Sequence, residues 1–136
     1  MNVEILFIVD KNPIHSSLLK YHLTIHRFQH VQLYHSAEEC IFRLKKNIQP
    51  AFIITEYDLA DYNGFDFLNM IKKYSPSSQI LFFSSFDDPI IAMQLIDAGA
   101  SDFIMKTAKV DQGIKNLIKN LLFIRKENQP TNILLH

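Results

Sequence analysis

The sequence predicts an α/β fold, in which a five-stranded parallel sheet is covered by helices on both faces. Short apolar runs alternate with segments whose apolar residues recur at helical spacing, five times along 136 residues. The central run, Ala51 to Ile54, is too short for a helix and wholly apolar, as in a strand buried on both faces. The connections are short, which favours successive β-α units in one parallel sheet. This length makes about one domain.

Capping residues divide the chain into its elements. Asn12-Pro13 and Asp88-Pro89 are typical starts of helices, as is Ser36 followed three residues later by Glu39. Gly99 is a typical stop at a helix carboxyl terminus. The expected strands are residues 4–9, 31–34, 51–54, 80–83 and 103–105. The expected helices are residues 13 to about 25, 37–46, 65–74, 89–98 and 110–121.

Apolar residues at helical spacing support the first, fourth and last helices. The first helix is indicated by four residues at helical spacing, Ile14, Leu18, Tyr21 and Ile25. On the fourth helix the residues expected to face inward are Ala92, Leu95 and Ile96. The last helix carries Leu117, Leu121, Leu122 and Phe123, which are more apolar residues than one buried stripe requires. This surplus predicts a protein-binding or homodimer face.

Composition excludes several functional classes. Lysine plus arginine equals aspartate plus glutamate, at 14 each, so no net field attracts nucleic acid or a membrane. The apolar runs are too short to span a bilayer, and the first residues lack the charged segment followed by an apolar one that would predict a signal peptide. The single cysteine, Cys40, is expected to be a small buried hydrophobe and fits a reducing cytoplasm. We therefore expect a cytoplasmic domain over residues 1–125, with a linker or tail over 126–136.

Polar residues stand where four of the apolar strands end. These are Asp10 with Lys11, Glu56, Ser84 and Lys106. The carboxyl ends of parallel strands share one edge of the sheet, where open α/β folds bind their ligands. The sequence therefore predicts a pocket containing acids, a hydroxyl and a lysine.

Four segments resemble the receiver domain of response regulators, the phosphoacceptor module of two-component signalling, over residues 3–124. They are Ile5-Leu-Phe-Ile-Val-Asp10, Phe52 to Leu59 with Gly64, Phe82-Phe-Ser-Ser85, and Gly99-Ala-Ser-Asp-Phe-Ile-Met-Lys106. The resemblance implies a flavodoxin-like (βα)5 fold with strand order 2-1-3-4-5 and a site at the topological switch point. It also implies a signalling domain and no enzyme.

The position of the family's phosphorylated aspartate holds glutamate here. In the family that aspartate lies three residues before a leucine and eight before a glycine, and counting back from Leu59 and Gly64 gives Glu56 both times. Asp58 is the alternative phosphosite, displaced by about 6–7 Å along an extended chain. Glutamate at the acceptor position predicts a degenerate pseudo-receiver.

Two further departures weaken phosphoryl chemistry. The family has a second acid after the first strand, which helps to hold Mg²⁺, and this chain has Lys11. An ammonium removes an oxygen ligand and adds a repelling charge, so Mg²⁺ binding should be weak or absent. Lys11 either pairs with Asp10 or Glu56 or points into solvent. Thr107 replaces a proline that follows the family's lysine, so that peptide bond is expected to be trans.

The groups that sense phosphorylation in the family remain. By resemblance, Lys106 contacts the phosphoryl group, the Ser84 hydroxyl moves toward it, and Phe103 swings inward. The alternatives are a strand-end cap for Ser84 and an ordinary half-buried aromatic for Phe103. We expect Glu56 to pair with Lys106 or Lys11 without drawing in the hydroxyl, because one carboxylate beside two ammonium groups is already neutralised.

The sequence leaves two functions open. The first is an unphosphorylated receiver that binds a protein partner through its fourth helix, fifth strand and fifth helix. The second is a working phosphoacceptor that uses Asp58 or an altered site, with an output domain further along the chain. His22 and His26 share a helix face, but no further ligands are signalled for a metal. With three glycines, the chain has no phosphate-binding loop.

Overall fold

The computed structural model describes residues 3–128 and confirms the predicted sheet. All neighbouring strands are parallel, in the order β2-β1-β3-β4-β5. The strands are β1 (Ile5–Val9), β2 (His30–Tyr34), β3 (Phe52–Thr55), β4 (Gln79–Ser84) and β5 (Asp102–Met105). The helices are α1 (Pro13–Ile25), α2 (Ala37–Leu44), α3 (Gly64–Tyr74), α4 (Pro89–Asp97) and α5 (Val110–Glu127).

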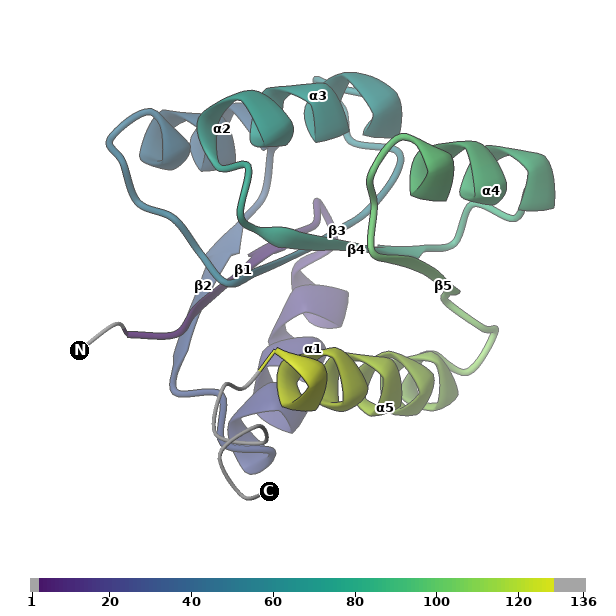
Figure 1. The fold of residues 1–136 in the computed structure, drawn as a ribbon. Coiled ribbons are helices and arrows are strands. Elements are labelled where there is room, and N and C mark those ends of the chain that lie inside the picture. Colours follow the sequence, from purple (N-terminus) through teal and green to yellow (C-terminus); the bar gives the residue numbers. More distant parts are fainter. Residues whose placement is uncertain (1–2, 129–136) are drawn as a thin grey trace.

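Helices cover both faces of the sheet. Helices α2, α3 and α4 lie on one face and α1 and α5 on the other (Figure 1). Each layer has its own apolar core. Phe67 and Ile53 belong to the core under α2 and α3, whereas Leu23 and Leu117 belong to the core under α1 and α5. Strand β3 contributes to both cores, since all four of its residues are buried.

The predicted caps form as expected. The Asn12 side chain accepts hydrogen bonds from the backbone N–H groups of Ile14 and His15, at 3.0 and 3.1 Å. Asp88 caps α4 in the same way. Gly99 has a φ of +116°, a left-handed conformation that favours glycine. These caps fix where the helices begin and end, and thereby how the strand ends are spaced.

Two helices bury only some of the apolar residues that indicated them, and on α4 the prediction is confirmed for Leu95 and wrong for Ile96. Helix α1 forms, but Ile14, Tyr21 and Ile25 are exposed, and its buried apolar residues are Leu19 and Leu23. On α4 only Leu95 is buried, and Ile96, which was expected to face inward, is 44% exposed. Both helices carry more apolar residues than one face of the sheet can cover, so spacing alone does not identify the buried stripe.

The ends of the domain differ slightly from expectation. Helix α5 continues to Glu127, two residues into the predicted tail, and residues 129–136 of that tail lie outside the described residues. Within residues 3–128, no helix has the length and apolarity needed to cross a bilayer. Cys40 is buried as expected, and burial raises the pKa of its thiol to about 12.

Candidate functional site

The strand-end residues meet at one edge of the sheet, as the parallel topology predicts. Asp10, Glu56 and Lys106 directly follow β1, β3 and β5, and Ser84 is the last residue of β4. All four are buried. The backbone ties these ends together, since the Glu56 N–H donates to the Val9 carbonyl at 2.9 Å. The site is therefore built on the rigid sheet.

Lys106 is the centre of the cluster. Its ammonium donates to Asp10 Oδ2 at 2.6 Å, to Glu56 Oε2 at 3.1 Å and to His15 Nδ1 at 3.0 Å. The ammonium also lies 5.5 Å from the centre of the Phe83 ring, on the α5 side of the sheet. A lysine ammonium has three donors. The three acceptors therefore use all of them, and the predicted Lys106–Glu56 ion pair is confirmed.

Glu56 divides its two carboxylate oxygens between different partners. Oε2 faces Lys106, whereas Oε1 accepts the Tyr57 backbone N–H at 2.9 Å and the Ser84 hydroxyl. The Ser84 oxygen in turn accepts the Phe86 backbone N–H at 3.0 Å. In residues 3–128, no buried side-chain nitrogen or oxygen lacks a hydrogen-bond partner. The cluster is thus complete without any added group.

The expectation that the Ser84 hydroxyl stays away from Glu56 is wrong, because the hydroxyl donates to Oε1. That expectation treated the carboxylate as neutralised as a whole. Lys106 occupies only Oε2, which leaves Oε1 free to accept the hydroxyl. Glutamate is also one methylene longer than aspartate, so its oxygens reach further from the end of β3.

Comparison with known proteins assigns the chain to a family. The family model described as the response regulator receiver domain matches residues 6–118. The chain belongs to this family. The receiver domain of RcsB from Salmonella enterica serovar Typhimurium, solved with the phosphomimetic BeF3⁻, superposes with a TM-score of 0.75 at 21% identity, covering 92% of this chain and 90% of that chain. At this identity the superposition shows the shared fold alone.

Two curated relatives agree with the assignment. The sensory transduction protein LytT of Bacillus anthracis is 28% identical over 115 residues, which cover 82% of this chain and 45% of that protein. The chemotaxis protein CheY of Thermotoga maritima is 27% identical over 74 residues, or 54% of this chain and 62% of that protein. The chain spans less than half the length of LytT.

Two charged candidates lie outside the cluster of this receiver domain. Lys11 is exposed. It was a candidate to pair with Asp10 or Glu56, but both of these carboxylates pair with Lys106. Asp58 is exposed in the loop after β3. Burial, followed by the nearby Asp58 carboxylate, raises the pKa of the Tyr57 hydroxyl. Neither Lys11 nor Asp58 is among the groups that hold Lys106.

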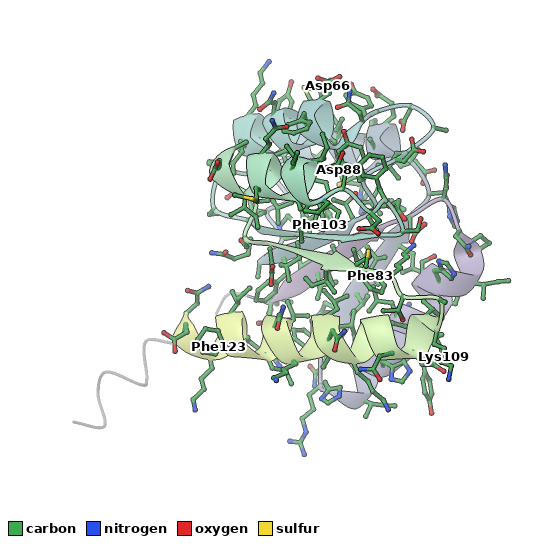
Figure 2. The ribbon with its side chains drawn as sticks, turned by 90° about the vertical axis from the view of Figure 1, so that its right-hand side faces the viewer. Asp66, Phe83, Asp88, Phe103, Lys109 and Phe123 are labelled. Carbon is green, nitrogen blue, oxygen red and sulfur yellow. The ribbon has the colours of Figure 1, made fainter. Side chains whose placement is uncertain are left out.

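Phe103 lies on the other side of the sheet from Lys106. Figure 2 shows Phe103 on the α4 side and Phe83 on the α5 side. The Phe103 ring is half-buried and stacks on Phe82, with ring centres 6.2 Å apart and planes 19° apart. It lines a cavity of about 190 Å³ at the start of α4, together with Asp88 and Ala92. Phe103 is therefore neither fully inward nor fully exposed.

The groups at the site do not fit Mg²⁺. This ion requires several oxygen ligands in near-octahedral geometry. Here the Lys106 ammonium already lies between Asp10 and Glu56, and an exposed lysine follows Asp10. Within residues 3–128, no three His, Cys, Asp or Glu side chains are grouped so that they could hold a metal.

Sequence reasoning missed the role of His15. The sequence analysis considered His22 and His26 alone among the histidines, yet His15 contacts Lys106 across 91 positions of the chain. A signal was present in the sequence. The Asn12 cap with Pro13 places His15 in the first turn of α1, and that turn begins at the edge of the sheet where the strands end.

An aromatic group beside the site was also missed. Tyr57 stacks on Phe86, with ring centres 4.7 Å apart and planes 22° apart. Gly64 makes room for it, because a Cβ there would lie 2.3 Å from the Tyr57 ring.

The peptide bond before Thr107 is trans as expected, since residues 3–128 contain no cis peptide bond.

Proposed function

We propose that this receiver domain signals without being phosphorylated, by protein–protein contact in the cytoplasm. The saturation of Lys106 carries the proposal. In the family this lysine contacts the phosphoryl group, and here its three donors are held by Asp10, His15 and Glu56. The Ser84 hydroxyl likewise donates a hydrogen bond to Glu56. An incoming phosphoryl group would have to break these contacts before it could make its own.

The loss of the metal ligand supports the same proposal. Phosphoryl transfer depends on positioning and on cations that stabilise the charge of the transferring group. Lys11 replaces the acid that helps to hold Mg²⁺ in the family, and Lys106 is already bound by two carboxylates. Asp58, the alternative phosphosite, does not contact this lysine. We therefore propose that neither Glu56 nor Asp58 is phosphorylated and that Mg²⁺ binds weakly or not at all.

Mass spectrometry after incubation with acetyl phosphate and Mg²⁺ tests this proposal. We expect no added phosphate on the chain, while a phosphorylatable receiver treated in parallel gains one. The double variant Lys11→Asp, Glu56→Asp is the matched control, because it restores both family acids. An added phosphate that maps to residues 52–64 of the unaltered chain would refute the proposal, and fragment masses would assign it to Glu56 or Asp58.

The partner surface we propose is the edge formed by α4, β5 and α5, which faces the viewer in Figure 2. Unusually many large apolar side chains are exposed on these elements, namely Ile90, Met93 and Ile96 on α4, Met105 on β5 and Phe123 on α5. Of the apolar residues expected to be surplus on α5, Leu117 and Leu121 are buried and Leu122 is half-buried, which leaves Phe123, 65% exposed. Such exposure is typical of surfaces that bind another protein or a second copy of the chain.

Light scattering combined with substitutions tests this surface. We expect self-association at high concentration, which Ile90→Lys or Met93→Lys abolishes because each places a charge in the apolar interface. Phe42→Lys is the control, since Phe42 is 57% exposed but lies on α2. A monomer at every concentration would exclude the homodimer and leave a different protein as the partner. Equal loss of association in all three variants would refute the choice of surface.

A further inference from the structure

His15 is the third acceptor for Lys106. A lysine ammonium can only donate hydrogen bonds, so the nitrogen that faces it, His15 Nδ1, must be the acceptor. The imidazole is then neutral and carries its proton on Nε2. The 3.0 Å contact therefore exists in only one protonation state of the ring.

Charged groups from three strand ends surround this contact. Lys106 follows β5, Asp10 and Lys11 follow β1, and Glu56 follows β3. Helix α1 adds no carboxylate to this set of charged groups, because residues 11–37 contain no aspartate or glutamate. Asp10 and Glu56 both pair with the ammonium that His15 holds. His15 is thus connected to both carboxylates through Lys106.

We propose that His15 is a positioning residue for Lys106 and makes the site respond to pH. This inference rests on the proposed function, in which no phosphoryl group enters the site. Histidine ordinarily changes its charge between about pH 5 and 8. When Nδ1 takes a proton from solvent, two cationic donors face each other where a donor faced an acceptor. The ammonium then leaves His15 and is held by Asp10 and Glu56 alone.

The displacement reaches two backbone amides. A shift of Lys106 changes its contact with Glu56 Oε2, and the other oxygen of that carboxylate accepts from the Tyr57 N–H and the Ser84 hydroxyl. The Phe86 N–H donates to Ser84. The amides of Tyr57 and Phe86 therefore report on His15, although neither touches it.

NMR titration of the full chain between pH 5 and 8, without phosphate or Mg²⁺, tests the proposal. We expect the amide resonances of Tyr57 and Phe86 to move through one transition, at the same pH as the His15 ring resonance. In His15→Asn the side-chain oxygen can accept from Lys106 but does not titrate in this range. The two amides should then stay at their high-pH positions throughout.

The control is His26→Asn, because His26 is exposed near the far end of α1, and we expect it to titrate like the unaltered chain. Amides that do not move in the unaltered chain would overturn the proposal. The same transition in His15→Asn would also overturn it, since another group would then be titrating. This experiment involves no phosphate, so its failure is distinct from finding a phosphorylated loop.

Discussion

Replacing Lys106 with methionine is the most informative single change. The ammonium pairs with two carboxylates, Asp10 at 2.6 Å and Glu56 at 3.1 Å, whose side chains are 7% and 6% exposed. Methionine keeps the apolar length of the side chain and removes the charge. Asp10 and Glu56 are then left close together, buried and without a cation. Breaking a buried ion pair is destabilising because the remaining charge is buried without compensation.

The expected losses are unequal. Breaking a buried pair by removing one partner costs about 3–5 kcal/mol, so Lys106→Met should lower the free energy of unfolding by that amount. Asp10→Asn or Glu56→Gln leaves Lys106 one carboxylate, and each should cost only about 1–2 kcal/mol, close to the value of a single hydrogen bond. Adding Glu56→Gln to Lys106→Met removes one uncompensated charge and should recover part of the loss.

Urea unfolding followed by circular dichroism measures these differences, provided that the slope with urea is unchanged. Lys11→Met is the matched control, because it removes an exposed lysine from the same edge and should change stability by no more than about 0.5 kcal/mol. Equal losses for Lys106→Met and Lys11→Met would refute the reasoning. So would a double variant less stable than Lys106→Met alone.

Three further predictions concern packing. Gly64→Ala should cost about 1–3 kcal/mol and weaken the near-ultraviolet signal of Tyr57, since the new methyl collides with that ring, as unfolding and circular dichroism can check. On α1, Leu23→Ala should cost about 2–5 kcal/mol and Tyr21→Ala under about 1 kcal/mol in urea unfolding, because only Leu23 is buried. Burial raises the pKa of Cys40 to about 12, so iodoacetamide at pH 8 should alkylate it only after unfolding, as mass spectrometry would show.

The fold was predictable because independent local signals agree. Asn12, Asp88 and Gly99 each mark a helix end by a hydrogen bond or a backbone conformation that depends on neighbouring residues alone. The apolar run of β3 requires burial on both faces, and a parallel sheet provides it. The buried faces of α1 and α4 were less predictable, because which stripe packs depends on the neighbouring layer.

The site was predictable in its members but not in its connections. Strand-end position brings Asp10, Glu56, Ser84 and Lys106 together in any parallel sheet of this order. Which oxygen accepts from which donor depends on side-chain length and direction, and here the sequence analysis was wrong for Ser84. His15 was missed because it reaches the cluster from a helix.

The charge of the site distinguishes two possible inputs. Two carboxylates and one ammonium leave the buried cluster of Asp10, Glu56 and Lys106 with one net negative charge. A phosphoryl group on Glu56 would replace a single charge with roughly −1.5 to −2, and without a metal it would move the cluster further from neutrality. A proton on His15 adds one positive charge beside the cluster and moves it toward neutrality. The charge balance of this cluster therefore supports the two proposals made above, that Glu56 is not phosphorylated and that His15 is the input.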